Sequence, residues 1–587
     1  MTVSDFLKQS VLLFDGSMGT YYNTLVHDMD APCELANMEN PQQIEEIHKQ
    51  YIASGAQAIK TNTFGANTVS LSAEWPKVEE VIRRGYQIAC RAAAGNCYVF
   101  ADIGPIPEKT DLQEYQKIAD TFLALDASNF LFETFSEYQT VIEMSRYIKA
   151  KKPDAFILAQ FAVSPDGYTR IGISGRTIME ELSAVWQVDA FGFNCLSGPS
   201  HLYRFVSQLN LPEKTISVMP NAGYPTVVNN RIYFDTSPAY FAQRMLDIKR
   251  CGVKILGGCC GTTPEHIRSV SELLKEDSGN VMQPKKTVLA ETKQRDAVNP
   301  FEEKLKSNKK VCAVELDPPF DTNISRFMEA AGSLKLADMI TVADCPIARA
   351  RMDSSMLSAK IARELGKEAM PHLACRDRNI NATKALLLGL NVESVRNVLV
   401  VTGDPIPQAE RNEVRGVFQF NSVMLAEYIR ELNETCFSAN PFHIAAALNI
   451  NAINFDAELT RAEKKVKAGV KTFLTQPVYT DEAVKNLALA KQQLEAYILG
   501  GIMPLVSYKN ANFINNEVSG ITIPQQIIEC YRDKTPDESA ELAVSLSYDM
   551  AGRIAPFVDG YYFMTPLNRV GIINRLLERM DANDRSR

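Results

Sequence analysis

Short apolar runs alternate with longer amphipathic stretches along the first half of the chain. The apolar runs read VLLFDG, AQAIKTNTFG, CYVFADIGP, NFLFETF, FILAQFAV, AFGFNCLSG, ISVMPNAG and VKILGGCCG, which makes eight. Stretches with helical periodicity lie between them, and those at residues 40–55 and 237–252 both close on glycine, as helices commonly do. Strand-like runs that alternate with helical patterns predict parallel β/α units.

The count starts again after a charged, weakly periodic stretch at residues 275–310. The second set reads VCAVELDPP, DMITVADCP, MPHLACRDRN, VLVVTGDPI, HIAAALNIN, TFLTQPVY, YILGGIMPLVS and DGYYFMTP, again eight. Eight β/α units in about 280 residues suit a (β/α)8 barrel. We therefore predict an α/β protein of two tandem (β/α)8 TIM barrels, with domains at 1–280 and 304–587 and a polar linker at 281–303. A doubly wound sheet is the alternative, but no GxGxxG motif follows a predicted strand.

Composition narrows the class of protein. The chain has 587 residues, of which 46% are hydrophobic and 22% charged, and a net charge of −8. The absence of a basic block argues against a nucleic-acid partner. No apolar run is long enough to span a bilayer and the N-terminus lacks a signal-peptide pattern, so we expect no membrane association and a cytoplasmic location. Twelve cysteines are too few for a disulfide scaffold, which leaves metal binding or catalysis for a minority of them.

Polar residues and cysteines gather where the predicted strands of the first half end. Cys195 ends the sixth run, and Cys259 and Cys260 end the eighth within a glycine frame that permits a kink. Because barrel active sites lie at the C-terminal ends of the strands, the three thiols could meet there. Three thiolates suit Zn²⁺ and leave a fourth position for a thiol substrate. A small buried cysteine with no metal is the alternative for each.

The strand ends of the second half carry another set of polar residues. They include Glu315, Thr341, Asp344, His372, Arg376, Asp404 and Gln476. The alternation in VELDPP places Glu315 and Asp317 on the same side of the strand. A carboxyl group in an apolar barrel mouth has a raised pKa and can act as a general acid. The alternative is a buried structural carboxylate with a partner.

The first half resembles a known family. LFDGSMGT, TNTFGAN, FETF, FGFNC and GGCCGTTPEHI are similar to motifs of the homocysteine S-methyltransferases, over roughly residues 5–280. The resemblance implies that Cys195, Cys259 and Cys260 bind zinc and that zinc binds the homocysteine sulfur. It also implies that Asp15 and Glu133 lie near the homocysteine amino group, and an ammonium group does need an anionic partner. We add Asn194, at the same strand end as Cys195, to the expected substrate site.

The second half resembles methylenetetrahydrofolate reductase over about residues 300–575. The shared motifs are VELDPP, PHLACRDRN, NVLVVTGDP, AGVKTFLTQPVY and GIMPLVSYKNANFINNEVSGITIP. The resemblance implies a barrel that binds FAD without a Rossmann domain. NAD(P)H would reduce the flavin, which would reduce 5,10-methylenetetrahydrofolate to 5-methyltetrahydrofolate. Glu315 would protonate the pterin nitrogen, Asp404 would lie near flavin and folate, and Gln476 would bind folate.

The same resemblance implies a set of FAD contacts. The expected positions are Thr341, His372, Gly403, Asp404, Glu458 and Lys465. This chain departs from the family at several of them. Many members read FEFFPP for VELDPP, and RGD where Thr402 precedes Gly403 here. Glu458 stands where some members have aspartate, and Asn449 where they have histidine.

The two resemblances in one chain imply a bifunctional enzyme of methionine and one-carbon metabolism. The methyl donor is open, because no DxHxxG cobalamin motif is present. We expect a sulfonium donor such as S-adenosylmethionine or S-methylmethionine, since a sulfonium leaves readily. A methylcobamide carried by a corrinoid partner protein, or 5-methyltetrahydrofolate itself, are the alternatives. A barrel that serves only as a binding or regulatory module is another, and related enzymes that form homo-oligomers leave self-association open.

Overall fold

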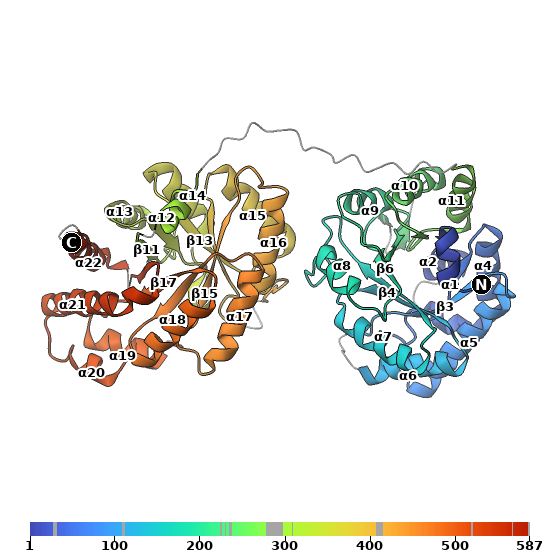
Figure 1. Cartoon of the computed structure of the whole chain (residues 1–587), viewed down its shortest axis with the longest axis horizontal. Coiled ribbons are helices and arrows are strands. Elements are labelled where there is room, and N and C mark those ends of the chain that lie inside the picture. Colours follow the sequence, from blue (N-terminus) through green and yellow to red (C-terminus); the bar gives the residue numbers. More distant parts are fainter. Residues whose placement is uncertain are drawn as a thin grey trace. The chain divides into compact units, whose positions relative to one another are not determined.

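The structure is a computed structural model. It describes all residues except 27–31, 108–111, 224–225, 229–230, 234–236, 278–297, 308, 407–414, 518–519, 566–567 and 585–587. The chain forms two compact units, Met1–Val288 and Leu289–Arg587 (Figure 1). Most of the predicted linker lies outside the described residues, and helix α12 (Pro300–Lys306) begins within the remainder of that range.

Eight parallel strands form the centre of the first unit. They are β1 (Leu12–Leu13), β2 (Ala58–Lys60), β3 (Tyr98–Ile103), β4 (Asn129–Phe135), β5 (Phe156–Ala162), β6 (Ala190–Asn194), β7 (Thr215–Met219) and β10 (Ile255–Leu256). Their hydrogen-bonded order is β1-β10-β7-β6-β5-β4-β3-β2. A parallel bridge between Phe14, next to β1, and Ala58 of β2 joins the two ends of this order and closes the ring.

Helices surround this ring. They are α1 (Val3–Gln9), α2 (Gly19–Val26), α3 (Ala36–Glu39), α4 (Pro41–Ala53), α5 (Trp75–Ala93), α6 (Leu112–Ala124), α7 (Gln139–Lys151), α8 (Gly175–Ser183), α9 (Pro199–Val206), α10 (Pro238–Arg250) and α11 (Pro264–Glu276). The helices predicted at 40–55 and 237–252 are α4 and α10. Both are followed by a glycine with positive φ, Gly55 and Gly252, as the glycine endings predict. An antiparallel pair, β8 (Thr226–Val228) and β9 (Arg231–Tyr233), follows β7.

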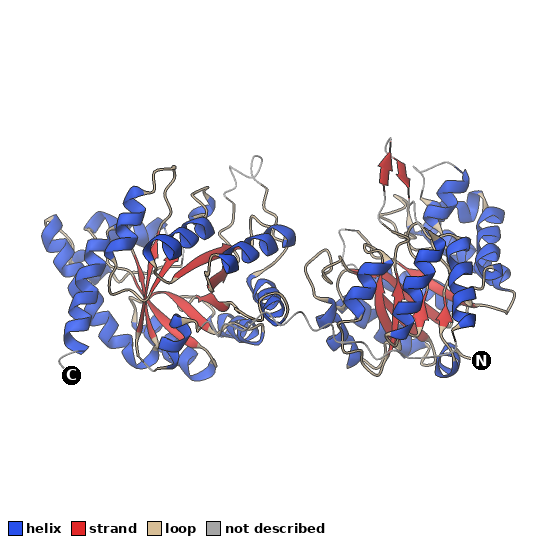
Figure 2. Cartoon of the chain, turned by 90° about the horizontal axis from the view of Figure 1, so that it is seen from above, coloured by secondary structure: helices blue, strands red, loops and turns tan. Residues whose placement is uncertain are grey.

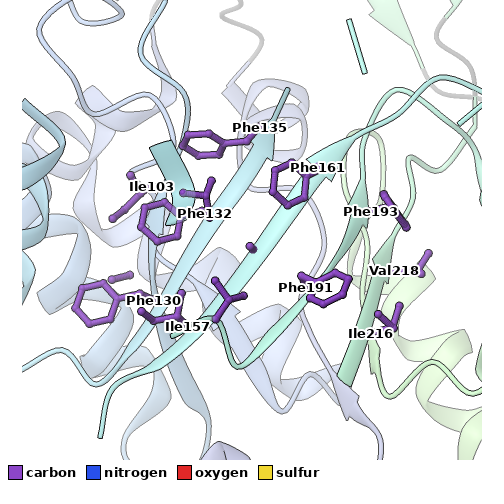
Figure 3. Packing of buried hydrophobic residues seen from close by; sticks show 14 of the residues in the cluster. Ile103, Phe130, Phe132, Phe135, Ile157, Phe161, Phe191, Phe193, Ile216 and Val218 are labelled. Atoms are coloured by element: carbon purple, nitrogen blue, oxygen red, sulfur yellow. The ribbon is translucent and has the colours of Figure 1, made fainter. Parts of the chain in front are cut away.

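Strand alternation separates two layers of the first core. Phe130 and Phe132 of β4 pack outward with Phe191 and Phe193 of β6, between strands and helices (Figure 3). Leu131 faces the barrel interior with other buried side chains, so the next residue but one, Glu133, also points inward. The same alternation turns Asn194 inward at the end of β6.

The second unit repeats the architecture. Its closed barrel consists of β11 (Val311–Leu316), β12 (Met339–Val342), β13 (Ala369–Ala374), β14 (Asn397–Val401), β15 (His443–Leu448), β16 (Thr472–Pro477), β17 (Tyr497–Ile502) and β18 (Gly560–Met564), in that order. The strands and the helices around them stand out by colour in Figure 2. Two eight-stranded parallel barrels confirm the predicted fold.

Further helices complete the second unit. After α12 come α13 (Ser325–Ser333), α14 (Ser354–Leu365), α15 (Ile380–Val392), α16 (Ser422–Glu434), α17 (Phe455–Lys467), α18 (Asp481–Gln493), α19 (Tyr508–Glu517), α20 (Gln525–Glu529), α21 (Pro536–Ile554) and α22 (Val570–Asp584). Short 3-10 turns lie at Pro346–Ala348 and Ala555–Phe557 in this unit, and at Cys33–Leu35 in the first unit. Among the described residues, no helix is both long and apolar enough to cross a membrane.

Candidate functional site

Three thiols converge at the C-terminal ends of strands β6 and β10 in the first unit. The sulfur atoms of Cys195, Cys259 and Cys260 all lie within 4.8 Å of one another, and Cys195 Sγ is 3.8 Å from Cys260 Sγ. Cys259 is buried, whereas Cys195 and Cys260 are partly exposed at the barrel mouth. The structure thus brings together the three cysteines that the sequence singled out.

Backbone geometry after β6 turns the first thiol toward the others. Cys195 and Leu196 both have left-handed conformations, with φ of 56° and 54°. Such angles are unfavourable for residues with a Cβ atom and persist only where the surroundings enforce them. The N–H of Cys195 donates to the carbonyl oxygen of Met219 on the neighbouring strand, at 3.2 Å. This bend brings Cys195 to the same side of the mouth as the cysteine pair.

The cysteine pair is held by a separate network. The N–H of Cys259 donates to Pro220 O at 2.8 Å, and the hydroxyl of Thr262 donates to Cys259 O at 2.7 Å. Glycine is required just before the pair, because a Cβ atom on Gly258 would lie 2.3 Å from Thr262 Oγ1. The phenol oxygen of Tyr51 on α4 lies 2.9 Å from Thr262 O, and this hydrogen bond helps to hold the turn that contains the cysteine pair. The pair is therefore presented by a rigid loop.

The donor set fits zinc. In a tetrahedral site with Zn–S bonds of about 2.3 Å, neighbouring sulfurs are about 3.8 Å apart. The 3.8 Å separation of Cys195 and Cys260 is close to that value. Hydrogen bonds from the other two thiols lower the pKa of Cys195, so the cluster already favours a thiolate. Pairing with the other two thiols, together with burial, raises the pKa of Cys259, which would need a cation to ionise.

A buried lysine lies beside the cysteine loop. Lys60, the last residue of β2, donates from Nζ to Glu133 Oε1 and to the Gly258 carbonyl oxygen, each at 3.2 Å. Its ammonium group is also 3.9 Å from Asp15 Oδ1, and its backbone N–H donates to Asp15 Oδ2 at 3.0 Å. Asp15 and Glu133, predicted from the sequence as substrate residues, therefore share an internal cation.

Burial shifts the proton affinities of this cluster. Desolvation raises the pKa of Asp15 to about 7, although Lys60 opposes the shift. Desolvation and the nearby Glu133 raise the pKa of Asp102 well above its usual range, which favours its protonated form. Burial acts to lower the pKa of Lys60, but the surrounding carboxylates outweigh it and raise the pKa. Lys60 is thus a fixed positive charge.

Asn194 connects the carboxylate cluster to the thiols. Its Nδ2 donates to Glu133 Oε1 at 3.3 Å and to Thr134 Oγ1 at 2.8 Å, and it lies 3.8 Å from Cys259 Sγ. Its Oδ1 accepts from the N–H of Thr134, which has a left-handed φ of 65°. A single amide therefore spans the gap between the predicted metal ligands and Glu133.

Glu315 of β11 lies at the centre of the second candidate site. The phenol of Tyr562 on β18 donates to its carboxylate, and His372 Nε2 on β13 is 3.6 Å from Oε2. Thr341 of β12 is fully buried and directly paired with Glu315 in the strand register. Four strands thus contribute to this cluster, which joins three residues predicted from the sequence with Tyr562.

The protonation states in this cluster differ from those in water. Desolvation, helped by the nearby Asp317, raises the pKa of Glu315 to about 7, and the hydrogen bond from Tyr562 partly opposes the rise. Burial lowers the pKa of His372 to about 3, so the imidazole is neutral at neutral pH. The carboxyl group of Glu315 can therefore hold a proton near pH 7 and release it, which is what a general acid requires.

Asp404 lies on the loop after β14 and is exposed. Its Oδ2 accepts from the N–H of Ile347 at 2.7 Å, and its carbonyl oxygen accepts from Arg376 Nη1 at 3.1 Å. Ile347 has a left-handed φ of 57°, so the carboxylate stabilises a strained turn. Within the described residues, no hydrogen bond or ion pair connects the Asp404 carboxylate to Glu315.

The remaining predicted residues lie further round the same barrel. Gln476 of β16 is partly buried. Glu458 of α17 accepts from the N–H of Asn449 at 3.2 Å and from Arg461 at 2.6 Å. The two positions that depart from the family pattern, Asn449 and Glu458, therefore contact each other. Lys465 Nζ donates to the Ala447 carbonyl oxygen at 2.8 Å, and burial lowers the pKa of its ammonium group.

Each half of the chain matches a known family. Residues 12–274 match the family model of homocysteine S-methyltransferase, and residues 300–581 match that of methylenetetrahydrofolate reductase. The chain joins one domain of each family. The cysteine cluster lies in the methyltransferase domain, and the Glu315 cluster lies in the reductase domain.

Individual relatives match just under half of the chain. Methionine synthase of Mycobacterium tuberculosis is 29% identical over 316 residues, which is 48% of this chain and 26% of the relative. Methionine synthase of Mycobacterium leprae is 30% identical over 296 residues, 45% of this chain and 24% of the relative. The chain thus spans about a quarter of the length of these relatives.

Solved structures similar to the chain include homocysteine methyltransferase MmuM from Escherichia coli. Its metallated form is 20% identical with a TM-score of 0.39, covering 46% of this chain and 99% of that one. The oxidised form is 21% identical, again with a TM-score of 0.39, covering 46% and 98%.

Three residues of the two domains were missed by the sequence analysis: Lys60, Asp102 and Tyr562. Lys60 had a detectable signal, since a lysine inside the apolar run AQAIKTNTFG must be buried and paired. Asp102 had the same signal in CYVFADIGP. Tyr562 had none, because a tyrosine in an apolar strand is ordinary in any core.

Proposed function

We propose that the chain is a bifunctional enzyme with a separate active site in each barrel. The methyltransferase domain converts homocysteine to methionine with zinc bound by Cys195, Cys259 and Cys260. The reductase domain converts 5,10-methylenetetrahydrofolate to 5-methyltetrahydrofolate with FAD and NAD(P)H. The observation that supports the first activity is the convergence of three thiols at the mouth of a barrel that matches the methyltransferase family.

In the methyltransferase domain, zinc would supply a Lewis acid that keeps the acceptor sulfur as a thiolate near neutral pH. The protein's own residues do the rest. The left-handed turn at Cys195 and the clamped loop of Cys259 and Cys260 fix the ligands before the metal arrives. Asn194 links this site to Glu133, so acceptor and metal share one rigid framework. Asp15, Glu133 and Asn194 line the proposed acceptor site.

The proposed methyl donor is a sulfonium compound. A sulfonium leaves as a neutral thioether, so the transfer needs no acid and no further protein. A corrinoid partner is the second candidate, and the similarity of this chain to two methionine synthases is the observation that favours it.

In the reductase domain, the flavin would carry the hydride from NAD(P)H to the folate. Thr341, His372, Gly403, Asp404, Glu458 and Lys465 are the proposed FAD residues. His372 supports this assignment, because its buried Nε2 has no hydrogen-bond partner among the described atoms. Gly403 supports it as well: with φ of 92° it lets the backbone turn at the mouth of the barrel without a side chain.

Glu315 is the proposed general acid, and Gln476 and Asp404 are proposed folate contacts. The proton on Glu315 would pass to the pterin nitrogen, which opens the five-membered ring to the reactive iminium. A carboxyl group whose pKa is about 7 holds that proton in a large share of molecules at neutral pH. The hydrogen bond from the phenol of Tyr562 positions this carboxyl group.

A donor assay tests the first activity. Zinc-loaded protein is given homocysteine with S-adenosylmethionine, S-methylmethionine, 5-methyltetrahydrofolate or a methylcobamide, each alone, and methionine is measured. We expect methionine with a sulfonium donor. Methionine only with the cobamide or only with the folate would show instead that the barrels act in series.

Cys195→Ser tests the ligand assignment. We expect loss of stoichiometric zinc and of methionine formation, because a serine hydroxyl is a poor zinc ligand. Cys90→Ser is the matched control, since Cys90 is exposed on α5, and it should keep both. Full zinc content and full activity in Cys195→Ser would remove Cys195 from the site.

A further inference from the structure

The acceptor site of the methyltransferase domain already contains an ammonium group. Lys60 is 5% exposed, and its Nζ lies 3.2 Å from Glu133 Oε1 and 3.9 Å from Asp15 Oδ1. These two carboxylates are the ones that the sequence suggests for the amino group of homocysteine. An acceptor ammonium would therefore have to share them with a lysine that is part of the barrel.

Lys60 is close to the thiol chemistry. Its Nζ donates to the carbonyl oxygen of Gly258, the residue that precedes Cys259. Its partner Glu133 accepts from Asn194, whose Nδ2 is 3.8 Å from Cys259 Sγ. The lysine and the proposed metal ligands thus belong to one continuous network at the barrel mouth.

The carboxyl groups around Lys60 carry little negative charge that Lys60 does not already compensate. The carboxyl groups that interact with Lys60 among the described residues are Asp15, Asp102 and Glu133. Burial and the nearby Glu133 raise the pKa of Asp102 and so favour its neutral form. Lys60 lies within 4 Å of both Asp15 and Glu133 and partly compensates their charge, so an added ammonium would meet a compensated pair and the repulsion of Lys60 itself.

We propose that Lys60 takes the place of the acceptor's α-ammonium group and so broadens the acceptor class. The methyltransferase domain then methylates ω-mercaptocarboxylates that lack the α-amino group, as well as homocysteine. This inference rests on the proposed methyltransferase function. The acceptor thiol loses its proton to solvent, its sulfur forms the new S–CH3 bond, and the sulfonium donor's C–S bond breaks, with the electron pair leaving on the neutral thioether.

Lys60 is a specificity residue in this scheme and needs no contact with the reacting atoms. A site built to hydrogen-bond a substrate group rejects an analogue without that group by about 10⁴-fold. Where the carboxylates are already paired with Lys60, an acceptor that lacks the ammonium group loses little binding free energy. The size of the preference for homocysteine over its des-amino analogue therefore reports how far Lys60 fills the ammonium position.

The test compares homocysteine with 4-mercaptobutyrate, which is homocysteine without its amino group. Binding of each thiol to the zinc-loaded protein is measured by calorimetry, and methyl transfer to each is measured with the sulfonium donor. We expect the dissociation constants and the kcat/KM values to differ by less than about 100-fold, far below the discrimination of a dedicated ammonium site. A larger preference for homocysteine would overturn the inference.

Variants of Lys60 make the test specific. Lys60→Met frees the two carboxylates, so the preference for homocysteine should rise at least about tenfold, while Lys60→Arg should keep the wild-type ratio because it keeps the charge. Lys8→Met, on the exposed surface of α1, is the control for loss of a lysine elsewhere. An unchanged ratio in folded Lys60→Met would also overturn the inference. If Lys60→Met does not fold, the comparison of homocysteine with 4-mercaptobutyrate on the wild-type protein still decides the inference.

Failure of this inference is distinguishable from failure of the proposed function. If methionine forms but 4-mercaptobutyrate is excluded, only the role of Lys60 is wrong. If neither thiol binds the zinc-loaded protein, the methyltransferase function itself fails, and the inference fails with it.

Discussion

The charge state of Glu315 depends on a balance between burial and one hydrogen bond. Desolvation raises the pKa of this carboxyl group to about 7, and the phenol of Tyr562 stabilises its ionised form. In the proposed reaction, the acid that folate reduction needs is the protonated form. Folate reduction should therefore be fast below pH 7 and decline above it, by about tenfold per pH unit once the group is mostly ionised.

Tyr562→Phe should move that decline to higher pH. The substitution removes the donor that favours the carboxylate, so the pKa of Glu315 rises further and its proton is kept longer. The measurement is the pH profile of flavin reoxidation by methylenetetrahydrofolate. Tyr561→Phe is the matched control, because Tyr561 is the preceding residue on β18 and its phenol donates instead to Ala551 O at 3.3 Å. A decline that moves to lower pH in Tyr562→Phe would contradict the assignment.

Glu315→Gln should separate the two halves of the reductase cycle. The amide has no proton to give at neutral pH, so flavin reoxidation by the folate should fall at least about 100-fold. Reduction of the flavin by NAD(P)H should continue, because it needs no acid. Stopped-flow absorbance of the flavin follows both steps. Normal folate turnover in the variant would remove Glu315 from its proposed role.

Single residues were predictable where their chemistry was unusual for their position. The three cysteines were recognised because paired thiols in a glycine frame have few structural uses. Lys60 was overlooked although a lysine in a buried strand demands partners, and its partners come from strands distant in sequence. No local pattern shows that Lys60 and Glu133, which are 73 positions apart, share a hydrogen bond.

At the scale of elements, the cysteine loop after β10 is a clamped turn. Gly258 and Thr262 form its ends, and Thr262 also receives a hydrogen bond on Oγ1 from the N–H of Ser17 at 3.1 Å. The loop that follows β1 and the loop that follows β10 are therefore fastened together. This arrangement presents two sulfurs at fixed positions before any metal binds.

Gly258→Ala should loosen this clamp. The added Cβ would lie 2.3 Å from Thr262 Oγ1, a distance that forces the turn to move. Zinc affinity, measured by competition with a chelator, should fall about 10- to 100-fold, as changes to the supports of a metal ligand commonly cause. Gly19→Ala is the control, because its added Cβ would meet only Cys33 Cβ at an ordinary 3.9 Å. Unchanged zinc affinity in Gly258→Ala would show that the turn is adaptable.

The elements themselves followed from the sequence. All sixteen predicted runs became barrel strands, because short, nearly continuous apolar runs between amphipathic helices are typical of buried parallel strands. Their lengths were less predictable: β1 and β10 have only two residues each in the sheet, although their apolar runs are longer. The polar residues at the ends of these runs lie beyond the hydrogen-bonded strand pairs, and they form the candidate site of the first unit.

At the scale of the whole molecule, each unit has its own core and its own candidate site. The main core clusters of the first barrel contain no residue of the second. Loss of zinc should therefore destabilise the methyltransferase domain alone. Calorimetry with and without a chelator should show one transition that moves to lower temperature and one that stays, since a ligand stabilises only the unit that binds it. A shift of both transitions would show that the units unfold together.

At position 195, selection for folding stability and selection for metal binding favour different residues. Glycine would adopt φ of 56° without strain, so a chain selected only for folding would gain by exchanging this cysteine. Cys195→Gly should therefore make the metal-free domain harder to unfold while removing one of its proposed zinc ligands. A lineage that no longer needed the methyl transfer would be expected to lose this residue early, and its sequence would record the loss at position 195 before the rest of the barrel drifted.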